Sequence, residues 1–298
     1  MRGVGSRYLR CSAEMPMAKR NSTPTKSSRL TRSRDAILGD HPVSPHPFGE
    51  LLIATDAATK NKVPHRVMVE ADGSRPAVVV ALREMVVQHH AGPEARKRSE
   101  QLREAIERLG LGAQLARLRR FPVNPATQKG NLAEIVLAEY VVAASKAALP
   151  VYRLRYNPNV DQSMKGDDVL AFDLDADPVR IIVGEAKFRA TSSATVVDEI
   201  VEALVRSHKA GIPASLQFVA DRLFDAGDVV LATRVSDCAR LFALGRLRID
   251  YVGMLLSDIQ SRSRVDAATP NSLRRLAMIS LGVNDPDSLV TDCYSKLE

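Results

Sequence analysis

The sequence has few cysteines and no long apolar run. Its three cysteines, Cys11, Cys238 and Cys293, lie far apart, form no CxxC pair and have no histidine nearby at zinc-ligand spacing. A disulfide framework and a zinc site are therefore not expected. No stretch approaches the roughly 18 apolar residues that span a bilayer, and the first residues lack the apolar run of a secretory signal. These absences indicate a cytoplasmic protein without a membrane segment.

Strong charge of one sign is also missing from most of the chain. The 298 residues carry 42 Lys or Arg against 35 Asp or Glu, a net charge of +7. Nine of the basic and only two of the acidic residues lie in residues 1–35, so the remainder is balanced. A neutral body can still carry a basic groove, because a sum says nothing about clustering. Total charge is therefore weak evidence for nucleic-acid binding.

Three segments are expected along the chain. Residues 1–45 are polar, rich in Ser, Thr and Arg, and end in proline-containing HPVSPHPFGE, which favours a flexible basic leader. Residues 46–122 are predicted to form an N-terminal α+β region, with a strand at RVMVEA and a charged helix over about 93–119. Residues 123–298 are predicted to form the main domain, ending in a mixed cap after Asp258.

The main domain is predicted to begin with the element order α-β-β-β-α. A helix over about 130–148 precedes three β-type runs, VYRLRY, DVLAFDLD and RIIVGEAKF. A second helix over about 194–209 has Ser192 or Ser193 as its N-cap, and LRIDYVGMLLS is predicted to be a fourth core strand. This order predicts an α/β fold with a mixed sheet flanked by helices.

Acidic residues and one lysine cluster on these elements. Side chains of a strand alternate between faces, so RIIVGEAKF places Glu185 and Lys187 on one side with Ile181 and Val183. In the preceding strand, KGDDVLAFD places Asp167 and Asp168 just before the apolar run, where either acid could stand at the sheet end; Asp168, next to the run, is favoured.

The helix before these strands adds another acid. Glu134, in GNLAEIVLAEY, shares a helical face with Leu137, Ala138 and Val141, and Glu139 has a similar setting. A carboxylate against an apolar face is costly unless it is paired or binds a cation. Helical spacing does not choose between the two glutamates, and either could point to solvent.

Several convergent carboxylates suit a magnesium site, since this ion prefers oxygen ligands. A nearby lysine would steady an attacking water and the charge that develops on a phosphate. Each piece is weak by itself, because ExK pairs at strand spacing are common on protein surfaces. Their order within about sixty residues is what favours a phosphodiesterase over surface ion pairs.

KGNLAE, MKGDDVLAF and VGEAKFR together resemble the PD-(D/E)XK nuclease superfamily and, more narrowly, the HamA family, the nuclease subunits of Hachiman anti-phage defence systems. The resemblance implies a restriction-endonuclease-like fold, magnesium or manganese, and DNA cleavage. It also implies a superfamily 2 helicase partner of the HamB type. Carried across residue by residue, it implies catalytic roles for Glu134, Asp168, Glu185 and Lys187, the three acids being the metal ligands. No proline precedes Asp167, so Asp167 stays an alternative ligand.

Basic residues near the motif are candidates for contact with a phosphate backbone, although a solvated strand end is the favoured role for any one of them. These residues are Arg153, Arg155, Lys165 and Arg189. Two rival functions stay open: a catalytically inactive nuclease-fold sensor or scaffold that docks a helicase, and a subunit whose main task is docking a partner. RNA also remains an alternative substrate.

Overall fold

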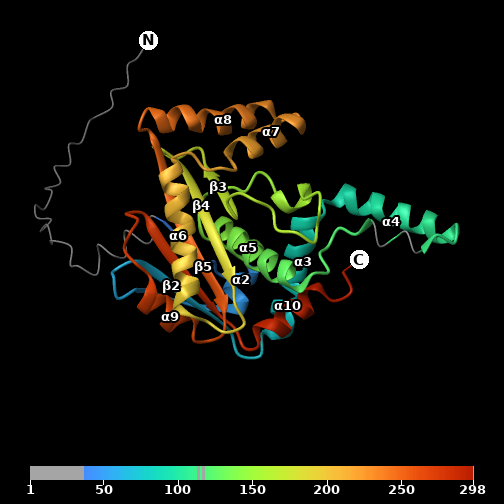
Figure 1. Ribbon diagram of the computed structural model, residues 1–298, viewed down its shortest axis with the longest axis horizontal. Coiled ribbons are helices and arrows are strands. Elements are labelled where there is room, and N and C mark those ends of the chain that lie inside the picture. Colours follow the sequence, from blue (N-terminus) through green and yellow to red (C-terminus); the bar gives the residue numbers. More distant parts are fainter. Residues whose placement is uncertain (1–36, 113–114, 116–117, 298) are drawn as a thin grey trace, which may run out of the picture.

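A six-stranded mixed sheet forms the centre of the molecule (Figure 1). The computed structural model describes residues 37–112, 115 and 118–297. The strands follow the order β1-β2-β6-β5-β4-β3. Their bounds are β1 Leu52–Ala58, β2 Pro64–Glu70, β3 Val169–Asp173, β4 Val179–Phe188, β5 Leu247–Ser257 and β6 Leu276–Gly282. The pairs β1/β2 and β3/β4 are antiparallel, and the pairs β2/β6, β6/β5 and β5/β4 are parallel. The predicted α/β fold with a mixed sheet is therefore confirmed.

Helices cover both faces of this sheet. One face packs on α3 (Arg75–His90), α5 (Pro125–Ala144) and α10 (Pro286–Tyr294) in a shared apolar core. The other face packs on α6 (Ala194–Ala210), α7 (Leu216–Asp225), α8 (Val229–Ala243) and α9 (Ser261–Ala268). The short α2 (Pro47–Leu51) leads into β1, and α4 (Pro93–Arg108) projects from the body (Figure 1). The result is three layers, with the sheet between two layers of helices.

The two helices that flank the motif begin at residues suited to capping. Asn124 accepts a hydrogen bond from the Ala126 N–H at 2.9 Å, and Pro125 follows at the first helical position of α5. The Ser193 hydroxyl accepts one from the Val196 N–H at the start of α6. Such side chains satisfy N–H groups that have no partner within the helix. The predicted N-cap of α6 is thus Ser193.

The predicted strand VYRLRY is wrong. Residues 153–156 form a 3-10 helix, η2 (Arg153–Tyr156), and only Ala148 pairs with β3, through a bridge to Phe172. Pro150 follows this bridge and has no N–H to donate to a ladder. The chain then turns so that the side chain of Arg153 reaches inward. β3 is therefore the edge strand of the sheet on the side opposite β1.

The predicted N-terminal region and the predicted C-terminal cap both contribute strands to this single sheet. β1 and β2 come from the predicted N-terminal region, and β6 comes from the predicted C-terminal cap. β6 lies between β2 and β5, so it joins the N-terminal strands to the rest of the sheet. The predicted strand at RVMVEA corresponds to β2. The charged helix expected over about 93–119 ends at Arg108.

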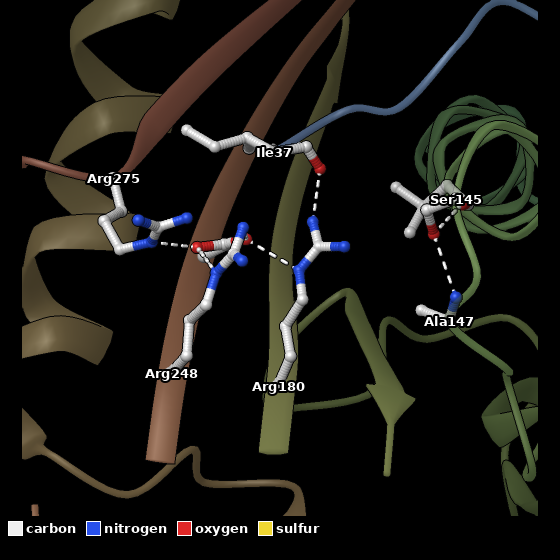
Figure 2. Close-up of polar contacts among 8 residues, drawn as sticks. Ile37, Ser145, Ala147, Arg180, Arg248 and Arg275 are labelled. Atoms are coloured by element: carbon white, nitrogen blue, oxygen red, sulfur yellow. Dashed lines mark hydrogen bonds and ion pairs between the residues drawn. The ribbon is translucent and has the colours of Figure 1, made fainter. Parts of the chain in front are cut away.

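Residues 37–45, assigned to the leader from the sequence, pack against the body of the protein. Ile37 and Leu38 are buried, and the Ile37 carbonyl accepts a hydrogen bond from Arg180 Nη2 at 2.5 Å (Figure 2). The same arginine pairs with Asp250, which is fully buried, at 2.7 Å. Apolar side chains and a buried guanidinium therefore hold this segment in place. The rest of the predicted leader, residues 1–36, lies outside the described residues.

In the part of the chain that the structure describes, no helix is both long and apolar enough to pass through a membrane.

Candidate active site

A cleft of about 830 Å³ opens where β3 begins and β4 ends, between α5 and α6. Polar side chains from the strands, the helices and the loop before β3 line it. The predicted site residues that line it are Glu134, Asp167, Asp168, Glu185, Lys187, Lys165 and Arg189. The four residues assigned catalytic roles come from α5, the start of β3 and the end of β4, so folding gathers three separate elements at one place.

Asp168 stands at the end of the β3/β4 ladder. The last ladder pair on this side is Val169 with Gly184, and β4 continues beyond it without β3 as a partner. The carboxylate of Asp168 accepts a hydrogen bond from the Ala186 N–H at 3.0 Å. One carboxylate oxygen thus completes the backbone pairing of β4. The bond holds Asp168 beside the residues that follow Gly184.

Glu185 and Lys187 lie on one face of β4, as predicted. Ile181 and Val183 share this face and belong to the core beneath α6, whereas Ala186 and Phe188 belong to the core beneath α5. The Lys187 ammonium forms an ion pair with the Glu185 carboxylate. The Glu185 side chain is 13% exposed and that of Lys187 is 29% exposed. Both polar ends therefore reach the cleft.

Glu134 enters the cleft from α5 because this helix lies very close to the sheet. At Gly184, an added Cβ would lie 2.8 Å from Val169 Cβ and 2.9 Å from Leu137 Cδ2, so the absent side chain allows the close approach. The Glu134 side chain is 10% exposed and forms an ion pair with Arg153 Nε at 2.9 Å. Glu139, the alternative acid of this helix, instead contacts His89 Nε2 at 2.7 Å and does not line this cleft.

The three acids lie close enough for the charge of one to raise the pKa of another. The pKa of Glu134 is raised to about 8, mainly by burial; the charge of Arg153 opposes this rise, and the charges of Asp168 and Glu185 add to it. Burial also raises the pKa of Asp168 and of Glu185, and the charge of Asp168 adds to the rise at Glu185. Carboxylates that disfavour one another's ionised form are suited to sharing a cation.

The donor set fits magnesium or manganese, since all three candidate ligands are carboxylates, and hard divalent ions prefer oxygen. The acids do not yet surround a common point. Within residues 37–112, 115 and 118–297, no three His, Cys, Asp or Glu side chains are arranged to hold a metal ion. Glu134 faces Arg153 and Glu185 faces Lys187 instead. Two of the acids would therefore have to reorient to surround a metal.

Asp167 lines the same cleft, but its carboxylate is occupied differently. One oxygen accepts from the Ser207 hydroxyl at 3.1 Å, and the other accepts from the Ser215 N–H at 2.9 Å. The Ser215 hydroxyl in turn accepts from the Asp167 N–H at 3.0 Å. These bonds tie Asp167 to α6 and to the start of α7. The contacts favour Asp168 as the metal ligand and Asp167 as a structural residue.

The four basic candidates divide into two pairs. Lys165 and Arg189 line the cleft, and Arg189 forms an ion pair with Glu199 at 2.7 Å. Arg155 is directed away: both Nε and Nη2 donate to the Gln88 carbonyl, and the guanidinium lies over the Tyr152 ring. Arg153 turns into the interior. Only the first pair lines the cleft where a substrate phosphate would enter.

Several lining residues were not singled out from the sequence. They are Lys129, Asn131, Arg206 and Ser207. A signal existed for Asn131, which precedes Glu134 by three residues and therefore shares its helical face. Asn131 is buried, with Nδ2 3.5 Å from His90 Nε2. Arg206 and Ser207 come from α6, and no pattern in the sequence connects them with the motif.

Two comparisons relate this chain to known proteins. The sequence profile of the HamA family matches residues 47–297, which include every element of the sheet and all four candidate catalytic residues. The chain is also 33% identical, over 269 residues, to the Hachiman protein HamA of Bacillus cereus. That alignment covers 89% of this chain and 95% of the relative.

Proposed function

Because this chain belongs to the HamA family, we propose that it is the nuclease component of a Hachiman anti-phage defence system. Its reaction would be metal-dependent hydrolysis of DNA phosphodiester bonds. The observation that carries the proposal is the meeting of Glu134, Asp168, Glu185 and Lys187 in one cleft from three elements of the fold. The PD-(D/E)XK resemblance of the same residues supports it.

In this proposal the three carboxylates hold one or two magnesium or manganese ions. When bound, such an ion polarises the phosphate and lowers the pKa of a water molecule. Glu185 and Asp168 are held on adjacent strands, so their spacing is set by the β3/β4 register. Glu134 closes the group from α5.

Lys187 has two tasks in the proposed mechanism. Its ammonium reaches the cleft beside Glu185 and can orient the water that attacks phosphorus in line with the leaving oxygen. Its positive charge also stabilises the negative charge that develops on the phosphoryl oxygens. Lys165 and Arg189 line the same cleft, which supports a role for them in contact with the substrate phosphates.

The family also supports a helicase partner. We propose that a superfamily 2 helicase subunit of the HamB type docks this chain and controls its access to DNA. A nuclease without such control would cut the DNA of its own host.

The ion pairs within the cleft favour one alternative function. Arg153 neutralises Glu134 and Lys187 neutralises Glu185, so the acids have partners without a metal. A catalytically inactive sensor or scaffold that binds nucleic acid and docks the helicase would need no more than this. The two functions differ in whether the protein breaks a phosphodiester bond.

The deciding experiment is cleavage of linear, nicked and circular DNA by the purified protein with magnesium, manganese or EDTA, alone and with its helicase. Lys187→Ala should lower the cleavage rate by at least about 100-fold, since it removes a charge that stabilises the transition state. Lys60→Ala, an exposed lysine in the turn after β1, is the matched control. A parallel RNA substrate tests the alternative nucleic acid.

Metal-dependent cutting that Lys187→Ala abolishes and Lys60→Ala retains would support the enzyme. Absence of cutting in every condition, with DNA or helicase binding retained, would favour the sensor or scaffold. Cutting of RNA but not DNA would identify RNA as the substrate and would leave the assignment of the site residues unchanged.

A further inference from the structure

Arg153 is the first residue of η2, and its guanidinium contacts three groups at the back of the cleft. Nε lies 2.9 Å from Glu134 Oε1. Nη2 donates to the Met164 carbonyl at 2.9 Å, and Nη1 donates to the Asp167 carbonyl. The Arg153 side chain is only 14% exposed. One largely enclosed side chain thus connects α5 with the loop that runs into β3.

The start of that loop is held by Asp161, whose carboxylate accepts hydrogen bonds from the N–H groups of Val123 and Asn124. Residues 157–168 contain no helix or strand, and Gly166 adopts a φ of +118°, which side-chain-bearing residues rarely adopt. The loop is held near its end by the bonds between Asp167 and Ser215. The two carbonyls bound by Arg153 flank Gly166. Arg153 therefore fixes the backbone immediately before Asp168.

Only arginine can make this set of contacts. A guanidinium is planar and carries five N–H donors that point in fixed, divergent directions, whereas a lysine ammonium is a compact point charge. Lysine could keep the ion pair with Glu134, but its single ammonium could not also reach the two carbonyls that Nη1 and Nη2 bind. The contacts therefore depend on the shape of the side chain as well as its charge.

From these contacts we infer that Arg153 is a positioning residue, which sets Glu134 of α5 against Asp168 of β3 for joint metal binding. The inference rests on the proposed function for the identity of the ligand. It differs from the expectation that Arg153 contacts a phosphate backbone, because Nη1 and Nη2 donate to interior carbonyls and Nε lies beside Glu134. Arg153 acts through the two carboxylates and does not touch the substrate.

The test is the binding of Mn²⁺ to the full-length, DNA-free protein, followed by the electron paramagnetic resonance of the free ion. Arg153→Lys retains the charge and removes the fork of donors, so it isolates the positioning role. Its dissociation constant for Mn²⁺ should rise by about 10- to 100-fold, as for other residues that orient a metal ligand. Arg153→Gln, which keeps a hydrogen-bond donor without the charge, is a second variant with the same expected direction.

Binding of linear duplex DNA in EDTA, measured over a range of salt concentrations, gives an independent readout. A positioning residue should leave this affinity and its salt dependence unchanged. A phosphate contact would weaken DNA binding and lower the salt slope by about 1. That outcome, with Mn²⁺ binding unchanged, would overturn the inference.

Arg66→Lys is the matched control for general destabilisation. Arg66 is also buried and also joins a carboxylate, that of Asp56 at 2.8 Å, to a backbone carbonyl, that of Gly39 at 2.9 Å, but it does not line the cleft. Its substitution should lower stability without changing Mn²⁺ binding by the folded protein. An equal loss of Mn²⁺ affinity in both variants would assign the effect to destabilisation and overturn the inference.

Three further outcomes would also test the inference or the proposed function. Tighter Mn²⁺ binding by Arg153→Gln would mean that Arg153 competes with the metal, which contradicts positioning. Failure of the wild-type protein to bind Mn²⁺ would overturn both the inference and the metal-dependent function. Binding of Mn²⁺ without cleavage would contradict only the proposed function, because the affinity shift in Arg153→Lys would still test the positioning role.

Discussion

The carboxylate of Asp168 accepts a hydrogen bond from the Ala186 N–H at 3.0 Å, just beyond the point where β3 and β4 stop pairing. The sheet edge is thus completed by a side chain that also faces the cleft. The neighbouring Asp167 makes its bonds in the opposite direction, to Ser207 and Ser215. Adjacent aspartates therefore have separable tasks.

Asp168→Asn should lower metal-dependent cleavage by at least about 100-fold if Asp168 is a metal ligand as proposed, because a ligand contributes no less than the residues that orient it. The asparagine oxygen can still accept the Ala186 N–H, so the stability of the fold should change little. Asp167→Asn should lower the free energy of unfolding by about 1–3 kcal/mol, because one of two buried acceptors is lost. Cleavage assays and urea unfolding of both variants measure these effects. The reverse pattern would identify Asp167 as the ligand.

Gly184→Ala should destabilise the protein by about 1–3 kcal/mol through overpacking. Its new methyl group would lie under 3 Å from Val169 Cβ and Leu137 Cδ2, and α5 would have to move away from the sheet. Gly130→Ala is the matched control in α5, where an added Cβ meets no atom within 4 Å. It should be neutral or stabilising by up to about 1 kcal/mol, since alanine favours a helix interior. Thermal unfolding compares the two, and equal stabilities would refute the close-packing argument.

Stability should fall as the pH is lowered from about 6.5 to 4. Burial lowers the pKa of His65 from 6.5 to about 4, with Asp266 opposing this shift and Arg262 adding to it. The unfolded chain therefore takes up the proton first, and folding is progressively disfavoured in that window. The loss from His65 is about 3 kcal/mol.

His65→Gln checks this dependence, since the glutamine can still bond the Ser280 hydroxyl that lies 2.8 Å from His65 Nε2. Its free energy of unfolding should depend less steeply on pH than that of the wild type. Part of the slope should remain, because burial also lowers the pKa of His90 to about 4. A slope identical to that of the wild type would exclude His65 as a cause.

Asp250→Asn should cost about 3–5 kcal/mol, since removing one member of a buried ionic cluster is strongly destabilising. The carboxylate of Asp250 is fully buried and is shared by Arg180, Arg248 and Arg275 (Figure 2). Asp237→Asn is the surface control, because the ion pair of Asp237 with Arg240 lies on the outside of α8 and should contribute nothing measurable. Urea unfolding separates the two, and a small change in Asp250→Asn would show that the arginines find other partners.

The sequence by itself determined the features that depend on one element. Alternation along a strand places Glu185 and Lys187 on the same side, because backbone geometry allows no other arrangement. Apolar periodicity likewise predicted β4, β5 and α6, and the resemblance of short motifs predicted the family. The mixed α/β fold followed from the order of these elements.

Only the tertiary structure decided the features that depend on contacts between elements. It separated Glu134 from Glu139, since both occupy similar helical positions but only Glu134 faces the cleft. Residues 153–156 of the predicted strand VYRLRY form η2, and the Arg153 side chain points to the interior. β6 lies between β2 and β5. Local patterns report which face of an element is apolar. They do not indicate which distant segment covers that face. The tertiary packing of α5, η2 and β6 determines it.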